Sequence, residues 1–309
     1  MLANFLSKTK PINYAVLLIL FVCCYLITFV KVFFKDGFVL EALLNGWAFL
    51  LLLLVIVFIF NFIVFKNRLT LDNSFAIYIF LLLLLLFLPN LFVYKTLFLL
   101  VIHLLFLRKI YSLKHTQSVL KKLFDAGFWL GISFLIEPLL LLFFVCIYVG
   151  TYLHQKISFQ TLFSPIIGFI TPLLLCFTYF FWHNRVHEFL ALLNAERIDN
   201  FLWYSKNTSV WFLAGLLLAS ILSFLLKSPK ALSINNSFKK NWILLIFNLF
   251  IALLFGLLLP EKNGYEFLYL LIPASIIIAN GLEVIKKDFI KNTVLIALLV
   301  GVIVGVFFL

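Results

Sequence analysis

The sequence predicts an all-α protein, built as a polytopic bundle of transmembrane helices. Of its 309 residues, 65% are hydrophobic and only 12% are charged, and the mean hydropathy is +1.19. A soluble domain has roughly 45–50% apolar and about 25% charged residues, so one globular core cannot bury this much apolar surface. The composition therefore excludes a soluble enzyme, a nucleic-acid-binding module and a disulfide-stapled secreted domain.

Apolar runs predict about eleven membrane segments within a single integral membrane domain over residues 1–309. Crossing the hydrocarbon core takes about 20 apolar residues at 1.5 Å each. The runs cover residues 12–34, 41–65, 74–88, 91–107, 126–136, 138–153, 162–182, 209–226, 242–259, 265–285 and 292–309. The first run is longer than the apolar part of a signal peptide and no small-residue cleavage site follows it, so we expect it to remain a transmembrane helix.

Two pairs of short runs predict hairpins. The runs 74–88 and 91–107 meet at Pro89-Asn90, and the runs 126–136 and 138–153 meet at Glu137-Pro138. The run 126–136 is too short to cross a bilayer alone. Non-helical backbone and a carboxylate at membrane depth persist only where protein or water shields them.

The charge distribution predicts the orientation. The net charge is +12, from 24 Lys and Arg against 12 Asp and Glu. With the N-terminus inside, most basic residues fall in inner connections, as the positive-inside rule requires. We therefore predict a multi-pass protein of the bacterial inner membrane with a cytoplasmic N-terminus. Most acidic residues then fall on the outer side, where we expect any polar chemistry.

Two connections have the pattern of interfacial helices. Residues 108–124 place apolar positions against a basic face, which predicts a helix lying on the inner leaflet. Residues 183–208 alternate charged and apolar positions at helical spacing and carry Trp203 and Tyr204 near their end. This second segment is predicted to lie on the outer surface with an aromatic anchor.

Two carboxylates are candidate catalytic residues. Asp36 lies in the first outer connection, where it is either a solvated loop residue or part of an outer site. Glu137 lies between two apolar runs, where a carboxylate marks a functional site by default. The alternative for Glu137 is a helix-end side chain that reaches the membrane interface.

Metal binding has one weak candidate, the pair His183 and His187. Their i, i+4 spacing puts both rings on one helix face, but the same pattern also occurs among polar residues of an interfacial helix. The four cysteines lie in apolar runs without the spacing of a zinc site. No metal site or cofactor is predicted beyond a divalent cation that these side chains could bind.

The segments DAGFWLGISFLIEPLLLLFFVCIYVG (125–150) and YEFLYLLIPASIIIANGLE (265–283), with the short hairpins, resemble the GT-C glycosyltransferases. The resemblance implies a GT-C-like fold and activity on polyprenyl-phosphate-linked sugars at the outer face. It implies that Asp36 serves as base or metal ligand and that Arg185 and Arg197 hold the lipid phosphate. The first outer connection is much shorter here than in that family.

The opening NFLSKTKPINY and the Phe-, Ile-, Lys- and Asn-rich composition also resemble an uncharacterised multi-pass family of Flavobacterium-like Bacteroidota. Three functions remain open at this point. The chain is either a GT-C-like enzyme, a non-catalytic accessory or scaffold subunit of an envelope-biogenesis or secretion complex, or, remotely, a metal-dependent membrane oxygenase using His183 and His187. The predicted partners are a membrane lipid or polyprenyl-phosphate carrier and other membrane proteins, without nucleic acid.

Overall fold

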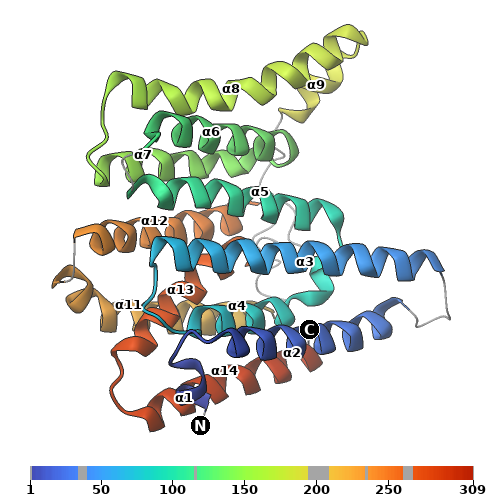
Figure 1. Ribbon diagram of the computed structural model, residues 1–309. Helices are drawn as coiled ribbons and strands as arrows, with labels where there is room; N and C mark the ends of the chain where they lie inside the picture. Colours follow the sequence, from blue (N-terminus) through green and yellow to red (C-terminus); the bar gives the residue numbers. More distant parts are fainter. Residues whose placement is uncertain are drawn as a thin grey trace. The chain divides into compact units, whose positions relative to one another are not determined.

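Helices form over the apolar runs, and the described residues contain no strand (Figure 1). The computed structural model describes residues 2–33, 40–114, 117–193, 209–233, 236–259 and 267–308. Within this part, six helices are long and apolar enough to cross a membrane. Together with the composition, these helices show an all-α membrane protein.

The chain divides into two compact units, each described here by itself. Unit 1 comprises Met1–Phe98, Phe201–Ser233 and Asn263–Leu309, and unit 2 comprises Leu99–Asn200 and Ile234–Lys262. Helix α5, Tyr94–Tyr111, begins in unit 1 and continues in unit 2. The other elements of unit 1 are α1 Leu2–Leu6, α2 Pro11–Phe33, α3 Leu40–Asn67, α4 Phe75–Leu86, η1 Leu88–Leu91, α11 Ser209–Ser233, α13 Leu268–Val284 and α14 Asp288–Phe308. Those of unit 2 are η2 Ser112–Lys114, α6 Val119–Ile136, η3 Pro138–Phe143, α7 Phe144–Leu153, α8 Phe159–Trp182, α9 Val186–Leu192 and α12 Asn236–Leu258.

Helix α13 forms the core of unit 1. All of its residues from Leu268 to Leu282 are buried, because α4 and α11 pack along it. The approach of α11 is close: a Cβ atom on Gly281 would lie 2.4 Å from that of Ser223. A helix that is apolar on every face is typical of such a central position.

Hydrogen bonds between a side chain and a backbone group join other helices of unit 1. The hydroxyl of Tyr25 on α2 donates to the carbonyl of Gly46 on α3 at 2.7 Å. The backbone N–H of Ala3 on α1 donates to the side chain of Asn292 on α14 at 2.8 Å. These bonds satisfy polar groups inside the protein, as a lipid environment requires.

Helices α6 and α8 of unit 2 lie side by side with their backbones in close contact (Figure 1). A Cβ atom on Gly127 would lie 2.0 Å from the carbonyl oxygen of Pro165, and one on Gly131 would lie 2.5 Å from that of Phe169. A Cβ atom on Gly168 would likewise meet the carbonyl oxygen of Phe124 at 2.1 Å. Small residues at four-residue spacing are the usual means of close helix packing in membranes.

The rest of unit 2 packs around Phe143 of η3. This buried ring lies against His103 of α5, with ring centroids 4.5 Å apart, and against Phe255 of α12, at 6.1 Å. Helix α12 also lies along α7. The N-terminal end of α12 and the C-terminal end of α7 are thereby neighbours, which positions the site described below.

The breaks at both predicted junctions are confirmed, and α6 packs against η3 and α7 as a hairpin would; the hairpin pairing of α4 with α5 stays a prediction. Helix α4 and α5 are joined through η1 around Pro89, and α6 is followed by η3, which starts at Pro138. Glu137 between α6 and η3 has extended backbone, with φ of −143°. The short predicted run 126–136 is the second half of the longer helix α6.

The prediction of one continuous helix over 108–124 is wrong. Residues 108–111 end α5, and α6 already begins at Val119. Polar contacts cross the break: Lys109 forms an ion pair with Asp125 at 2.6 Å, and Lys122 donates to the carbonyl of Ser112 at 3.0 Å. These lysines join the two helices, whereas the prediction placed them on one basic face.

The predicted outer segment 183–208 is described only in its first part, to residue 193. Helix α9 covers seven of these residues, Val186–Leu192. Trp203 and Tyr204 lie outside the described residues, so the aromatic anchor stays a prediction.

The contact between α6 and α8 predicts that Gly127→Ala destabilises the protein by about 1–3 kcal/mol, since the added methyl group meets a backbone carbonyl. Thermal unfolding in detergent, followed by size-exclusion chromatography, measures the loss. Gly215→Ala on α11 is the matched control, because nothing lies within 4 Å of the Cβ position there. Equal melting temperatures for the two variants would contradict the close packing.

Candidate anion-binding site

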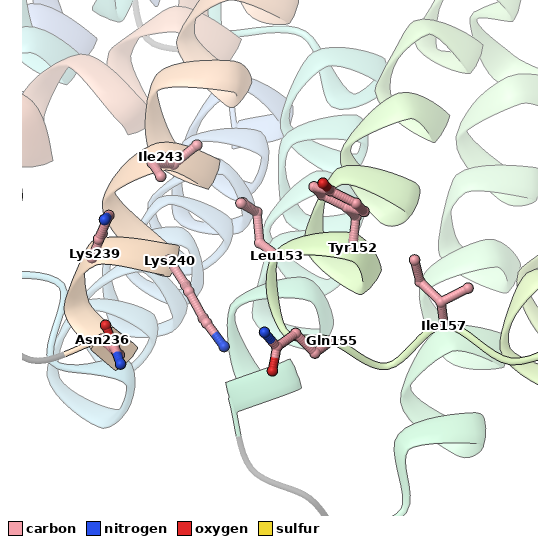
Figure 2. Close-up of a pocket in the computed structure, with 8 residues that line it drawn as sticks. All are labelled: Tyr152, Leu153, Gln155, Ile157, Asn236, Lys239, Lys240 and Ile243. Carbon is pink, nitrogen blue, oxygen red and sulfur yellow. The ribbon is translucent and has the colours of Figure 1, made fainter.

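A hollow of about 630 Å³ lies in unit 2 between the end of α7 and the start of α12. Figure 2 shows its walls: Lys240 extends from α12 toward Gln155, while Tyr152 and Ile157 lie on the other side. The lining residues are Tyr152, Leu153, Gln155, Ile157, Asn236, Lys239, Lys240 and Ile243. None of them is acidic, and two are lysines.

The position of the two lysines in α12 is electrostatically unfavourable without a ligand. Lys239 and Lys240 are the fourth and fifth residues of a helix that has no acidic residue in its first turn. The N-terminal end of a helix carries a partial positive charge and its free N–H groups bind anions. The two ammonium groups are repelled by the positive end of the helix dipole. An anion bound between them and the helix end would be attracted by both.

The opposite wall is the turn that ends α7. The N–H groups of Gln155 and Lys156 donate to the carbonyls of Tyr152 and Thr151, both at 3.0 Å. This turn holds Gln155 in the left-handed region, with φ of 55°, a conformation that usually favours glycine. The amide side chain of Gln155 thus comes to line the hollow.

His154 lies beside this wall, at the C-terminal end of α7. It is 7% exposed, and its Nε2 lies 3.3 Å from Oδ1 of Asn241. Burial, together with the positive charges of Lys240, Lys156 and Lys114, lowers the pKa of His154 to about 4, although the hydrogen bond to Asn241 opposes this shift. The imidazole is therefore neutral at pH 7 and donates Nε2–H to the amide oxygen.

The hollow can bind an anion with several acceptor oxygens. Lysine ammonium groups and amide N–H groups are donors toward phosphate, and the hollow offers two lysines with the amides of Gln155 and Asn236. The lining contains no Ser, Thr, Cys, His, Asp or Glu. Within the described part of the chain, no group of three His, Cys, Asp or Glu residues is placed to hold a metal ion.

Unit 1 contains a second polar grouping, built on a buried ion pair. Lys227 on α11 lies 2.5 Å from Glu283 on α13, and both side chains are only 3% exposed. The other oxygen of Glu283 accepts from the backbone N–H of Leu71 and the amide of Asn73, each at 2.7 Å. One carboxylate thereby fixes α11, α13 and the connection between α3 and α4.

Asn280 extends this grouping by one turn of α13. Its Nδ2 donates to the carbonyl of Leu69 at 2.8 Å and to that of Ile276 at 2.9 Å. A small cavity adjoins the same connection, lined among others by Arg68, Asp72 and Asn73, with room for little more than one water molecule. The grouping therefore serves the packing of unit 1.

The predicted site residues that the structure describes lie elsewhere. Asp36 and Arg197 are outside the described residues. Glu137 is half-buried at the end of α6, where its backbone N–H donates to the carbonyl of Ser133 at 2.8 Å. Arg185 precedes α9, beyond the far end of α8. Because α8 is about 36 Å long, Arg185 is well separated from the hollow, which lies at the start of α8.

The residues around His183 contact one another. Arg185 Nε lies 3.7 Å from Glu188 Oε1, and His187 Nε2 lies 4.0 Å from the same oxygen. His183 Nδ1 lies 2.8 Å from the carbonyl oxygen of Tyr179. Metal binding by His183 and His187, and phosphate binding by Arg185 and Arg197, stay predictions.

Sequence reasoning missed Lys239, Lys240 and Gln155. Lys239 and Lys240 lie before the apolar run 242–259, so the positive-inside argument counts them in an inner connection and gives them no other role. One available signal was that they follow Asn236 and Ser237, residue types that commonly begin helices. No signal in the sequence pairs Gln155 with a helix that begins 81 residues later.

A family model matches residues 1–308 of the chain. The chain belongs to the family of unknown function DUF6427. No curated protein and no solved structure matches it. Membership of DUF6427 thus covers both units, and the function must be argued from the residues themselves.

The buried ion pair predicts that Glu283→Gln and Lys227→Met each destabilise the protein by about 3–5 kcal/mol, because each leaves a buried charge without its partner. The double variant should lose less than the sum of the two single variants. Denaturant or thermal unfolding measures all three. The control is Asp288→Asn, which removes a 4.0 Å contact with Lys291 at an exposed position and should cost no more than about 0.5 kcal/mol. Additive losses would show that the two charges do not stabilise one another.

Proposed function

We propose that this protein binds the phosphate group of a membrane lipid in the hollow between α7 and α12. The observation that carries the proposal is the pair Lys239 and Lys240, which line the hollow at the positive end of α12 without an acidic residue in the lining. An anionic ligand offsets three positive sources at once, the two ammonium groups and the helix dipole. A neutral or cationic ligand would gain nothing from this arrangement.

The place of the hollow in the chain favours a lipid as the source of the phosphate. Helices α8 and α12 are candidate membrane spans, and the hollow lies at the start of both. Span ends lie at the level of lipid headgroups. Tyr152 and Ile157, which are 69% and 57% exposed, add apolar surface to the lining. Basic pockets between membrane helices commonly bind anionic headgroups.

We place this site on the cytoplasmic side of the bacterial inner membrane, with the N-terminus cytoplasmic. The support is the distribution of Lys and Arg among the short connections, since the connections on the side of Lys156, Lys239 and Lys240 carry most of them. The cytoplasmic leaflet contains anionic lipids, so this orientation brings the hollow to its ligand.

Two lipids present the chemistry that the hollow selects: an anionic glycerophospholipid and a polyprenyl-phosphate carrier. The second is the class of carrier on which the GT-C-like interpretation has the chain act, although that chemistry would lie at the outer face, through Asp36, Glu137, Arg185 and Arg197, and not in the cytoplasmic hollow. A non-catalytic subunit of an envelope-biogenesis or secretion complex would also use a lipid site, to fix its position in the membrane. The two experiments below separate these possibilities.

The first experiment removes the charge of the hollow. The double variant Lys239→Gln/Lys240→Gln should weaken binding of a phosphate-bearing lipid by about 10- to 30-fold, since each lysine near a membrane surface contributes about 1 kcal/mol toward an anionic headgroup. Native mass spectrometry or fluorescence binding in phosphatidylcholine nanodiscs measures the change, with phosphatidylglycerol and undecaprenyl phosphate titrated separately.

The matched control is Lys286→Gln/Lys287→Gln, a second pair of adjacent lysines that is exposed between α13 and α14 and lines no described cavity. Equal losses for the two pairs would reduce the effect to general surface charge and refute the site. Preference for undecaprenyl phosphate would favour the carrier, and preference for phosphatidylglycerol would favour a bulk phospholipid.

The second experiment tests catalysis. If the chain transfers a sugar from a carrier, Asp36→Ala should reproduce the full loss of surface glycan that deletion of the gene causes, because the base or metal ligand is gone. Glycan staining and growth measure the outcome, and Glu41→Ala, at an acid near the start of α3, is the control. Normal glycans in the Asp36 variant beside a defective deletion strain would favour the accessory subunit.

A further inference from the structure

We propose that His154 couples the hollow to pH, so that binding of a lipid phosphate takes up a proton at this imidazole. This inference rests on the proposed lipid-phosphate site and concerns how pH regulates binding there. His154 is a positioning residue here, since it does not line the hollow and acts through the residues that do.

The hydrogen bond between His154 and Asn241 joins the two walls of the hollow. His154 directly precedes Gln155 on the α7 side, and Asn241 directly follows Lys240 on the α12 side. Both members of the bond are buried, at 7% and 2% exposure. The 3.3 Å contact therefore helps to set the distance between Gln155 and Lys240, which the ligand must span.

Every charged group that acts on His154 from the described part of the chain is positive. Lys114 acts from η2, Lys156 from the turn after α7, and Lys240 from α12, while Lys239 lines the same hollow. Burial and these charges together hold the pKa of His154 at about 4. An anion bound to the lysines offsets their field and thereby favours the imidazolium form.

Linkage fixes the sign of the effect. Since the bound anion raises the pKa of His154, protonation of His154 strengthens anion binding by the same factor. If the pKa rises by about one to two units, the affinity at about pH 5 exceeds that at about pH 7.5 by roughly two- to tenfold. Above pH 7 the imidazole is neutral in both states and the affinity is constant.

The chemical class of the headgroup decides which lipid can reveal the stronger binding at low pH. A phosphomonoester has a second pKa of about 6, so it loses charge over the same range and masks the effect. A phosphodiester keeps its single charge throughout. We therefore expect the gain at low pH with phosphatidylglycerol as the ligand.

The experiment measures phosphatidylglycerol binding in phosphatidylcholine nanodiscs at about pH 7.5 and about pH 5 for the full chain and for His154→Gln. Glutamine retains an N–H donor toward Asn241 but does not titrate, so binding at pH 7.5 should persist and the gain at pH 5 should vanish. The controls are His187→Gln, at a histidine that is 80% exposed near the end of α8, and His115→Gln, which lies outside the described residues. Both controls should keep the gain.

A second measurement follows the protonation of His154 directly by NMR in the unsubstituted protein, so its result does not depend on the binding activity of a variant. With labelled histidine, the NMR signal that is missing in His154→Gln should titrate at a higher pH when phosphatidylglycerol is present. An unchanged midpoint, or a gain that His154→Gln retains, would overturn the coupling. If Lys239→Gln/Lys240→Gln leaves binding intact at both pH values, the lipid site itself fails, which is a distinct result.

Discussion

A single carboxylate, that of Glu283, determines how unit 1 can pack. Hydrocarbon cannot solvate polar groups, so a buried charge must find all of its partners within the protein. Glu283 finds three partners on two separate segments: Lys227 on α11, and the N–H of Leu71 and the amide of Asn73 in the connection between α3 and α4. Helix α13 carries this carboxylate and is buried along its length. The positions of α11 and of the α3–α4 connection beside α13 therefore follow from the hydrogen bonds and the ion pair that Glu283 requires.

Unit 2 meets the same constraint by close backbone contact. Lipid offers no hydrophobic driving force between apolar helices, so association depends on packing area and on polar groups satisfied between helices. Gly127 and Gly168 bring α6 and α8 into backbone contact, and the hydroxyl of Ser164 donates across the contact to the carbonyl of Leu120 at 2.8 Å. These contacts fix α8 against α6 within unit 2.

The helices could be predicted from the sequence because their length and apolar composition are local properties. The ion pair of Lys109 with Asp125 across the break between α5 and α6 could not be predicted, because such a pairing needs three-dimensional proximity. The partner of Glu283 lies 56 residues away on another helix, and periodicity carries no such information. The predicted run 242–259 began after Lys239 and Lys240 because hydropathy excludes lysine. The prediction therefore puts both lysines in a connection, whereas the structure places them inside α12.

Burial distinguishes the two kinds of charge in this protein. The side chains of Lys227 and Glu283 are each 3% exposed and form an ion pair with one another, so these two charges stabilise the packing of α11 against α13. Lys239 and Lys240 line an open hollow at the N-terminal end of α12, where the partial positive charge of the helix opposes them. A residue choice that opposes local electrostatics is expected where function requires it. The neutral state of His154 follows from its burial and, in addition, from the field of these lysines, and only the second of these causes is offset when an anion binds in the hollow.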